Sequence, residues 1–282
     1  MAKTDTVQQP QYYLSRINTQ VRNYNVYIMS SAEKLLYTLA TLICGGAVGL
    51  IFYGGLFKKD GVATLATTIS NIVVFTAIGL LAVKMFLPVI TESLRQKQIK
   101  KLRSQFCDFA AAFTNSLGSG MNVQEAINAS YRDLVSQYSP EELIVTEVAE
   151  MINGMHNNIA VEDMIADFGA RSGIADIENF AIVFSTCFRT GGNIKSVVRR
   201  TTEVISEKLI IASEIETTIT SNKMQMTIMN VLPILIVFMM RTMSAEFAAS
   251  FSSIIGVVVL TISVAMFVAA YKWGQKIMDI KG

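Results

Sequence analysis

The sequence predicts an all-α, multi-pass membrane protein with four transmembrane helices and a six-helix cytoplasmic bundle. Three observations carry this prediction. Of the 282 residues, 51% are apolar and only 16% are charged, whereas soluble domains carry about 25% charged residues. The apolar residues gather in four long runs that contain no charged residue. The segment between the second and third runs shows helical periodicity with no strand-like alternation.

The first two runs predict a transmembrane hairpin over residues 35–83. A helix needs about 20 apolar residues to cross the hydrocarbon core of a bilayer. Leu35 to Phe57 and Val62 to Val83 both meet that requirement. Residues 1–34 are then expected to form a cytoplasmic N-terminal tail.

The last two runs predict a second hairpin over residues 224–271. Met224 to Met240 is the shorter run and contains Asn230 and Pro233, and the proline is expected to kink the helix. Phe251 to Tyr271 is the fourth run. Residues 272–282 would form a C-terminal cytoplasmic tail.

Polar and small residues within the runs favour packing over transport. Ionisable residues at membrane depth usually mark a pathway, and the predicted cores contain none. Asn71 and Asn230 are interpreted as interhelical hydrogen-bonding residues in preference to an ion site. Gly45 and Gly49 form a GxxxG pair that permits close helix approach. That pair fits dimerisation and the packing of span one on span two equally well.

Positive charge near the span ends predicts the orientation. Two lysines, Lys58 and Lys59, and Arg241 lie on one side. The other side has fourteen basic residues: Arg16, Arg22, Lys34, Lys84, Arg95, Lys97, Lys100, Lys101, Arg103, Lys208, Lys223, Lys272, Lys276 and Lys281. Both termini and residues 84–223 are therefore expected to be cytoplasmic, in a protein of the cell membrane.

Turn signals divide the cytoplasmic segment into helices. Gly118 and Gly120 end the first helix. Asn122 caps the second, with Glu125 completing a capping box. A third helix is expected with Ser139 as N-cap, Pro140 at its first position and Glu142 at its third. Glu162 and Asp163 open a fourth helix, and a fifth begins near Ile174. Core-facing stripes are predicted at Leu102, Phe106, Phe109, Phe113, Leu117, Val123, Ala126, Ile127, Leu134, Ile144, Val148, Met151, Ile152, Val161, Met164, Ile165, Phe168, Ile174, Ile177, Phe180, Ala181, Phe184, Phe188, Ile194, Val197, Val198, Thr201, Val204 and Ile205.

The clearest turn is Thr190-Gly191-Gly192-Asn193. Its glycines permit the left-handed conformation that ends a helix, and Asn193 can cap the next helix. No breaker follows before Pro233, so this sixth helix is expected to continue into the third span as a rod of roughly 70 Å. Such a rod would couple motion of the domain to motion of the membrane helix.

A weak internal repeat accompanies these turns. The stretch SGMNVQEAI, from Ser119, is similar to NNIAVEDMI, which starts 38 residues later at Asn157. Both read as a tight turn followed by a helix with an acidic first turn, which suggests stacked helical hairpins.

The sequence contains no recognisable motif of a catalytic, nucleotide-binding or metal-binding site. The single histidine, His156, has no cysteine or second histidine nearby, and Cys44, Cys107 and Cys187 are widely spaced. No phosphate-binding loop, GxSxG or HExxH motif occurs. We expect no catalytic residues, no cofactor and no metal, and hence no enzymatic activity. The net charge of +2 gives no sign of nucleic-acid binding.

The acidic residues of the domain allow two interpretations. Glu141, Glu142, Glu147, Glu150, Glu162, Asp163 and Asp167 concentrate near helix starts. Complementarity to the helix dipole and solubility explain them most simply. The alternative is a docking face for a basic partner, centred on Glu141, Glu142, Glu162 and Asp163. The basic residues after span two are expected to mark topology and to contact anionic lipids.

LGSGMNVQEAI followed by FRTGGNIKSVV resembles the domain named for the F component of type II secretion systems, over about residues 91–243. That family provides the inner-membrane platform of secretion and type IV pilus machines. Many members carry the domain twice, whereas this chain carries it once behind two extra spans, as in tight-adherence (Tad/Flp) pilus platforms. The family often has Gly where this chain has Asn158, and Asn also tolerates a left-handed turn.

The resemblance implies a set of partners. A separate hexameric ATPase would dock on the cytoplasmic domain, and movement of the platform would lift pilin-like subunits from the membrane. A second platform protein, or a second copy of this chain, would complete the assembly. The alternatives are a membrane receptor or signalling adaptor, and a transporter or membrane enzyme. The missing intramembrane charges and catalytic clusters weigh against the last.

Overall fold

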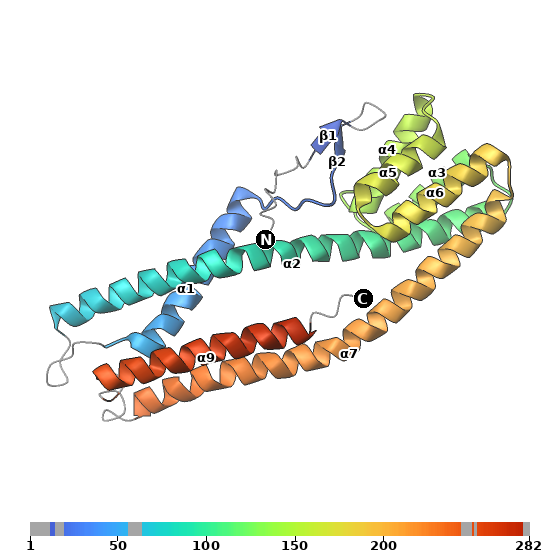
Figure 1. Ribbon diagram of the computed structural model, residues 1–282. Helices are drawn as coiled ribbons and strands as arrows, with labels where there is room; N and C mark the ends of the chain where they lie inside the picture. The colour runs from blue at the N-terminus through green and yellow to red at the C-terminus, as the bar shows by residue number, and fades with distance from the viewer. Residues whose placement is uncertain (1–11, 15–19, 56–63, 244–249, 251–252, 279–282) are drawn as a thin grey trace, which may run out of the picture. The chain divides into compact units, whose positions relative to one another are not determined.

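The computed structural model describes residues 12–14, 20–55, 64–243, 250 and 253–278 (Figure 1). These residues fall into two compact units. The helical unit comprises Met1–Ile28 and Thr91–Ser213, and the apolar unit comprises Met29–Ile90 and Glu214–Gly282. Lys58 and Lys59, which sequence places on the outer side of the membrane, lie outside the described residues.

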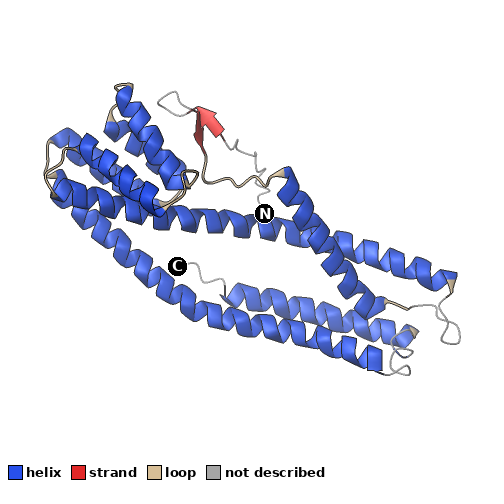
Figure 2. Ribbon diagram, turned by 180° about the vertical axis from the view of Figure 1, so that it is seen from behind, coloured by secondary structure: helices blue, strands red, loops and turns tan. Residues whose placement is uncertain are grey.

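The described part of the chain is almost entirely helical (Figure 2). Its elements are β1 Tyr12–Leu14, β2 Gln20–Arg22, α1 Ser31–Tyr53, α2 Leu65–Gly118, α3 Val123–Gln137, α4 Leu143–His156, α5 Val161–Ser172, α6 Ala175–Thr190, α7 Ile194–Met243 and α9 Ile254–Met278. Sequence did not predict the strands β1 and β2, which pair antiparallel within the expected N-terminal tail.

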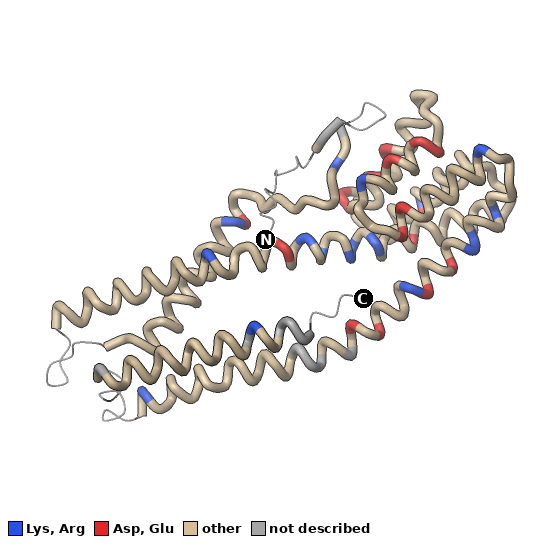
Figure 3. Tube along the Cα trace, in the orientation of Figure 1, with Lys and Arg blue, Asp and Glu red and all other residues tan. Residues whose placement is uncertain are grey.

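Four helices are long and apolar enough to cross a membrane. They are Ser31–Tyr53, a window within Leu65–Gly118, Met224–Met243 and Ile255–Gly274. Few charged residues lie along these stretches in Figure 3, whereas Lys, Arg, Asp and Glu recur along the remaining helices. Within the described residues, most of each predicted apolar run therefore lies in a helix of membrane-spanning length.

Within the apolar unit, α1 packs closely on α2. A Cβ added at Gly45 would lie 2.5 Å from the Cβ of Ala82, and one added at Gly49 would lie 2.9 Å from a methyl group of Ile78. Both glycines of the GxxxG pair therefore lie where α1 and α2 approach each other closely.

Polar contacts surround the C-terminal end of α1. Arg241, in the last turn of α7, donates to the carbonyls of Leu50 at 3.2 Å and Ile51 at 2.5 Å, and also to that of Gly54. The carbonyls at a helix C-terminus lack intrahelical partners and carry partial negative charge. Asn71 accepts a hydrogen bond from the Gly55 N–H at 2.8 Å, as its interpretation as an interhelical hydrogen-bonding residue predicts.

We expect Gly45→Leu to lower the melting temperature of the detergent-solubilised protein. The new side chain would be forced against Ala82, and overpacking of this kind costs about 1–3 kcal/mol. The matched control is Ala47→Leu, at an exposed position of the same helix. Thermal melts followed by circular dichroism measure both, and equal melting temperatures would contradict the close packing.

The helical unit is built around an aromatic core. Phe106 packs edge-to-face on Phe180 with ring centroids 5.2 Å apart, and Phe113 lies 6.0 Å from Phe184. Buried residues from α2, α3, α4, α5, α6 and α7 join one cluster. Most of the predicted stripes supply this core, so the helical periodicity identified the inward faces correctly.

Two predicted core residues are exposed instead. Phe188 lies in the last turn of α6, where one face of its ring stacks on Phe184 and the rest stays open. Val204 is exposed because α7 meets the core along Val198, Thr202 and Ile205, a spacing that turns Val204 away.

The expected start of the third cytoplasmic helix is wrong by three residues. Ser139 does not cap it; α4 begins at Leu143 with Glu142 as N-cap. The Glu142 N–H donates to the Ser139 carbonyl at 3.0 Å, closing a turn around Pro140. Pro fits the second position of such a turn as well as the first position of a helix, and sequence alone does not separate the two.

Two helices belong to both units. α2 runs for 54 residues through Pro88 without a break, and α7 runs for 50 residues through Pro233. The uninterrupted α7 confirms that the sixth helix continues into the third apolar run. At 1.5 Å per residue it is about 75 Å long.

Candidate functional site: a buried charge cluster and the helix-end turns

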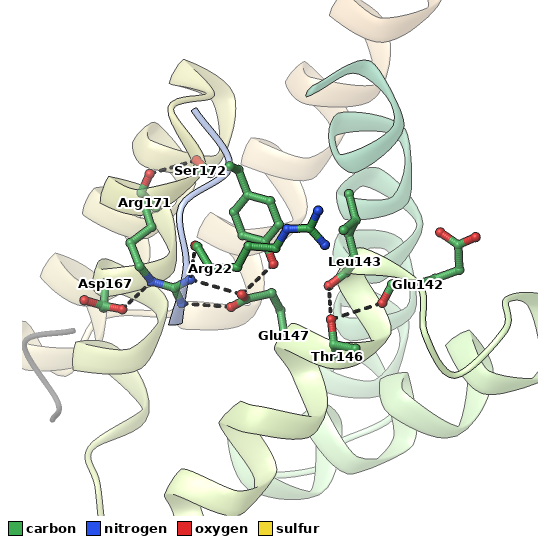
Figure 4. A network of polar contacts seen from close by, with 10 residues as sticks. Arg22, Glu142, Leu143, Thr146, Glu147, Asp167, Arg171 and Ser172 are labelled. Carbon is green, nitrogen blue, oxygen red and sulfur yellow. Dashed lines mark hydrogen bonds and ion pairs between the residues drawn. The ribbon is translucent and has the colours of Figure 1, made fainter. Parts of the chain in front are cut away.

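Three charged side chains meet inside the helical unit (Figure 4). Arg171 on α5 donates to both carboxylate oxygens of Glu147 on α4, at 2.8 and 3.0 Å, and to Asp167 at 2.6 Å. Each of the three residues is only 5–6% exposed. Buried charges are costly unless they are paired and hydrogen-bonded, so the cluster is stable only with all three in place.

An N-terminal strap, residues Val21–Asn25, covers this cluster. Tyr24 is 1% exposed, and its hydroxyl donates to Glu147 at 2.6 Å. The Arg22 carbonyl accepts from Arg171 at 3.1 Å. Gln98 on α2 donates to the Tyr24 carbonyl at 3.3 Å and accepts from the Arg22 guanidinium at 3.2 Å. Strap, α2, α4 and α5 are thus joined through one hydrogen-bonded network.

The surroundings of Tyr24 and Arg171 determine the protonation states of these two side chains. Burial raises the pKa of Tyr24, and the negative charge of Glu147 raises it further. Burial alone would lower the pKa of Arg171, but its hydrogen bonds to Glu147 and Asp167 outweigh that effect and raise the pKa. At neutral pH Tyr24 remains a neutral donor and Arg171 remains charged. The arrangement suits structural locking.

A second cluster joins the two long helices. Asp176, in the first turn of α6 and 7% exposed, pairs with Arg103 on α2 at 2.5 Å and with Lys208 on α7 at 3.3 Å. Farther along, Thr114 lies 3.1 Å from Thr202, hydroxyl to hydroxyl. α2 and α7 therefore run antiparallel and side by side within the helical unit.

The turn between α2 and α3 matches its prediction. α2 ends at Gly118, and Gly120 has φ +94°. The Met121 N–H donates to the Ser116 carbonyl at 3.3 Å, which closes the helix end. Asn122 accepts from the Glu125 N–H at 2.9 Å, and Glu125 accepts from the Asn122 N–H at 3.2 Å. The predicted capping box is present.

The turn between α4 and α5 repeats this geometry 38 residues later. Asn158 occupies the position of Gly120 and has φ +58°. The Ile159 N–H donates to the Gly154 carbonyl at 2.9 Å, as Met121 does to Ser116. Where Asn122 caps α3, Ala160 precedes α5 and makes no side-chain cap. The repeat is therefore a real duplication of the helix-ending turn, without the second cap.

The Thr190–Asn193 turn closes α6 and opens α7. Gly191 ends α6 with φ +66°, whereas Gly192 does not have a positive φ. The Gly192 N–H donates to the Cys187 carbonyl at 3.1 Å. Thr190 donates to the Thr186 carbonyl at 2.9 Å, and Asn193 accepts from the Ser196 N–H at 3.2 Å. Only one of the two glycines is required by the backbone.

The four proposed docking carboxylates separate into two pairs. Glu141 and Glu142 precede α4, and Glu162 and Asp163 open α5, close in sequence to the other end of α4. α4 has 14 residues, so it spans about 21 Å. Glu142 binds Lys101 at 2.7 Å, and Asp163 binds Arg189 at 3.1 Å. Docking of a basic partner stays a prediction, with each pair as a separate candidate.

Two other carboxylates do not match their interpretation as solvated charges. Glu147 and Asp167 are buried partners of Arg171. The sequence held a signal, because each lies three or four residues from apolar stripe positions and so faces the core. No pattern of neighbouring residues in the sequence predicted that the strap covers Glu147 and Asp167.

Across the described residues, no group of three or more His, Cys, Asp and Glu side chains could hold a metal ion. Comparisons of the chain with family models, with curated proteins and with solved structures find no match. The case for a function therefore rests on the chain's own residues.

Proposed function

We propose that the chain is a membrane platform protein of a pilus-assembly or type II-like secretion machine. A six-helix bundle on the cytoplasmic side would receive a separate ATPase, and its movement would be transmitted to the spans that hold pilin-like subunits. The sequence support is the pair of motifs LGSGMNVQEAI and FRTGGNIKSVV. The platform would sit in the cell membrane with both termini inside and would assemble with a second platform protein or with itself.

The observation that carries the proposal is the continuity of α2 and α7. Each helix runs unbroken from a stretch of membrane-spanning length into the helical unit. There the two helices are pinned together through Asp176. A continuous helix transmits displacement better than a flexible linker does, so a force applied to the helical unit would reach both spans.

The decisive experiment is co-purification. A tagged full-length chain, expressed with the secretion-type ATPase and the small pilins of the same organism, is expected to retain the ATPase in mild detergent. The chain alone is expected to hydrolyse no ATP. Glu141→Lys with Glu142→Lys, and separately Glu162→Lys with Asp163→Lys, test which acidic pair contributes. Absence of any ATPase association, or retention of a sensor-type partner instead, would favour the signalling-adaptor alternative.

The proposed topology is tested by cysteine labelling in intact cells. With Cys44, Cys107 and Cys187 replaced, a single cysteine at Lys59 or Ala245 is expected to react with an impermeant maleimide. A cysteine at Tyr138 should react only after the cells are lysed. Labelling of Tyr138→Cys from outside would reverse the orientation and remove the docking site from the ATPase.

A further inference from the structure

The three charged side chains under the strap remain paired with one another without the strap. If Val21–Asn25 left, Arg171 would keep its contacts with Glu147 and Asp167. No lone charge would remain buried, so the largest penalty for opening would be avoided. The opening would uncover the recess in which the Tyr24 ring meets Phe168 edge-to-face, with centroids 6.2 Å apart.

That recess has specific recognition chemistry. Glu147 accepts a hydrogen bond from a phenol at its end. Arg171 and Gln98 donate to the backbone carbonyls of Arg22 and Tyr24, so the site binds the main chain of a segment that leaves strand β2 at Arg22 and turns at Tyr24. Two carboxylates beside one guanidinium give the site a formal charge of −1, and Arg22, whose side chain donates to Gln98, brings one positive charge into the same network.

The geometry points to a docking site for an Arg-x-Tyr segment that turns at its tyrosine, which the chain's own strap occupies as a releasable latch. Release of the strap unlocks α2, α4 and α5 from the N-terminal segment and leaves the site open. The latch lies wholly within the helical unit and operates whatever machine the chain serves.

Gly173 offers a way to push on the strap through its Asn25 side chain. It ends α5 with φ +64°, and a Cβ added there would overlap the Asn25 carboxamide. Gly191 is a matched control, because it ends α6 with φ +66° and has nothing within 4 Å of an added Cβ. Alanine at either position brings the same left-handed strain, but only Gly173→Ala strikes the strap.

Hydrogen–deuterium exchange of the full-length chain in lipid nanodiscs measures the release of the strap. Amides of residues 21–25 are expected to exchange about tenfold faster in Gly173→Ala than in wild type. Gly191→Ala should leave them unchanged, and Asn25→Gly added to Gly173→Ala should restore slow exchange. Equal exchange in Gly173→Ala and Gly191→Ala would overturn the latch.

Binding in trans tests the site itself. A fluorescent peptide of residues 19–27 is expected to bind the Tyr24→Ala chain, whose own strap is disabled, and not the wild type. A peptide with Tyr24→Phe should bind more weakly because it lacks the hydroxyl for Glu147. If the helices of the Tyr24→Ala chain lose their protection from hydrogen exchange, the experiment uses the Gly173→Ala chain instead, with a peptide that carries Asn25→Gly. Fluorescence anisotropy of the peptide measures binding. No binding to the variant chain, or equal binding to the variant and the wild type, would overturn the docking site.

Discussion

Replacing Arg171 by methionine is expected to reduce the opening free energy of α4 and α5 by about 3–5 kcal/mol. The side chain pairs with Glu147 and Asp167, each 6% exposed. Methionine has a similar length but leaves two carboxylates buried with no positive partner. Native-state hydrogen exchange of the α4 and α5 amides measures the opening free energy directly.

The control is Arg189→Met. Arg189 pairs with Asp163, but the two side chains are 67% and 54% exposed. Exposed pairs contribute little, so the change should stay within about 0.5 kcal/mol. Adding Glu147→Gln and Asp167→Asn to Arg171→Met should recover part of the loss by removing the buried charges. Equal effects of Arg171→Met and Arg189→Met would show that water reaches the cluster.

Local chemistry explains why the helix ends were predictable. Positive φ is costly for most side chains, so Gly120, Asn158 and Gly191 mark left-handed positions that few other residues tolerate. The capping box at Asn122 depends on two residues three apart. Such features are written within a few neighbouring residues, and the structure has them where the sequence indicates.

Long-range features were not predictable from local patterns. The strap reads as a polar stretch, because Arg22, Asn23 and Asn25 surround Tyr24. The burial of Tyr24 depends on Glu147, which lies 123 residues farther along the chain. The Asp176 cluster likewise joins α2, α6 and α7. Only the tertiary fold brings these groups together, and no periodicity encodes it.

The continuity of α2 was not evident from local patterns. The second uncharged run ends at Lys84, and Pro88 follows four residues later. α2 passes through both positions. A proline removes one helical hydrogen bond, and neighbouring groups can compensate for it within a long helix. The continuity of α2 therefore had to come from the structure, whereas that of α7 was predicted, and the proposed coupling depends on both.

The double variant Gly191→Val with Gly192→Val is expected to reach the membrane at near-normal levels yet fail to support filament assembly. Gly191 has φ +66°, and a β-branched residue there costs about 1–2 kcal/mol. At Gly192 a Cβ would lie 3.0 Å from the Cys187 Sγ. The turn joins α6 to α7, so its distortion would redirect the start of the helix that continues into the third span.

Single variants separate the two glycines in the same assay, which is surface filament or secreted-subunit yield normalised to membrane-inserted protein. Gly191→Asn should preserve the yield, because Asn tolerates the left-handed region. Gly192→Ala should be mild, since Gly192 has no positive φ and the Cys187 side chain needs to move by only a few tenths of an ångström. Asn157→Ala, at a residue with φ −92°, is the neighbouring-loop control. A normal yield from the double valine variant would reduce this turn to a generic loop and would remove the strongest sequence support for a platform protein.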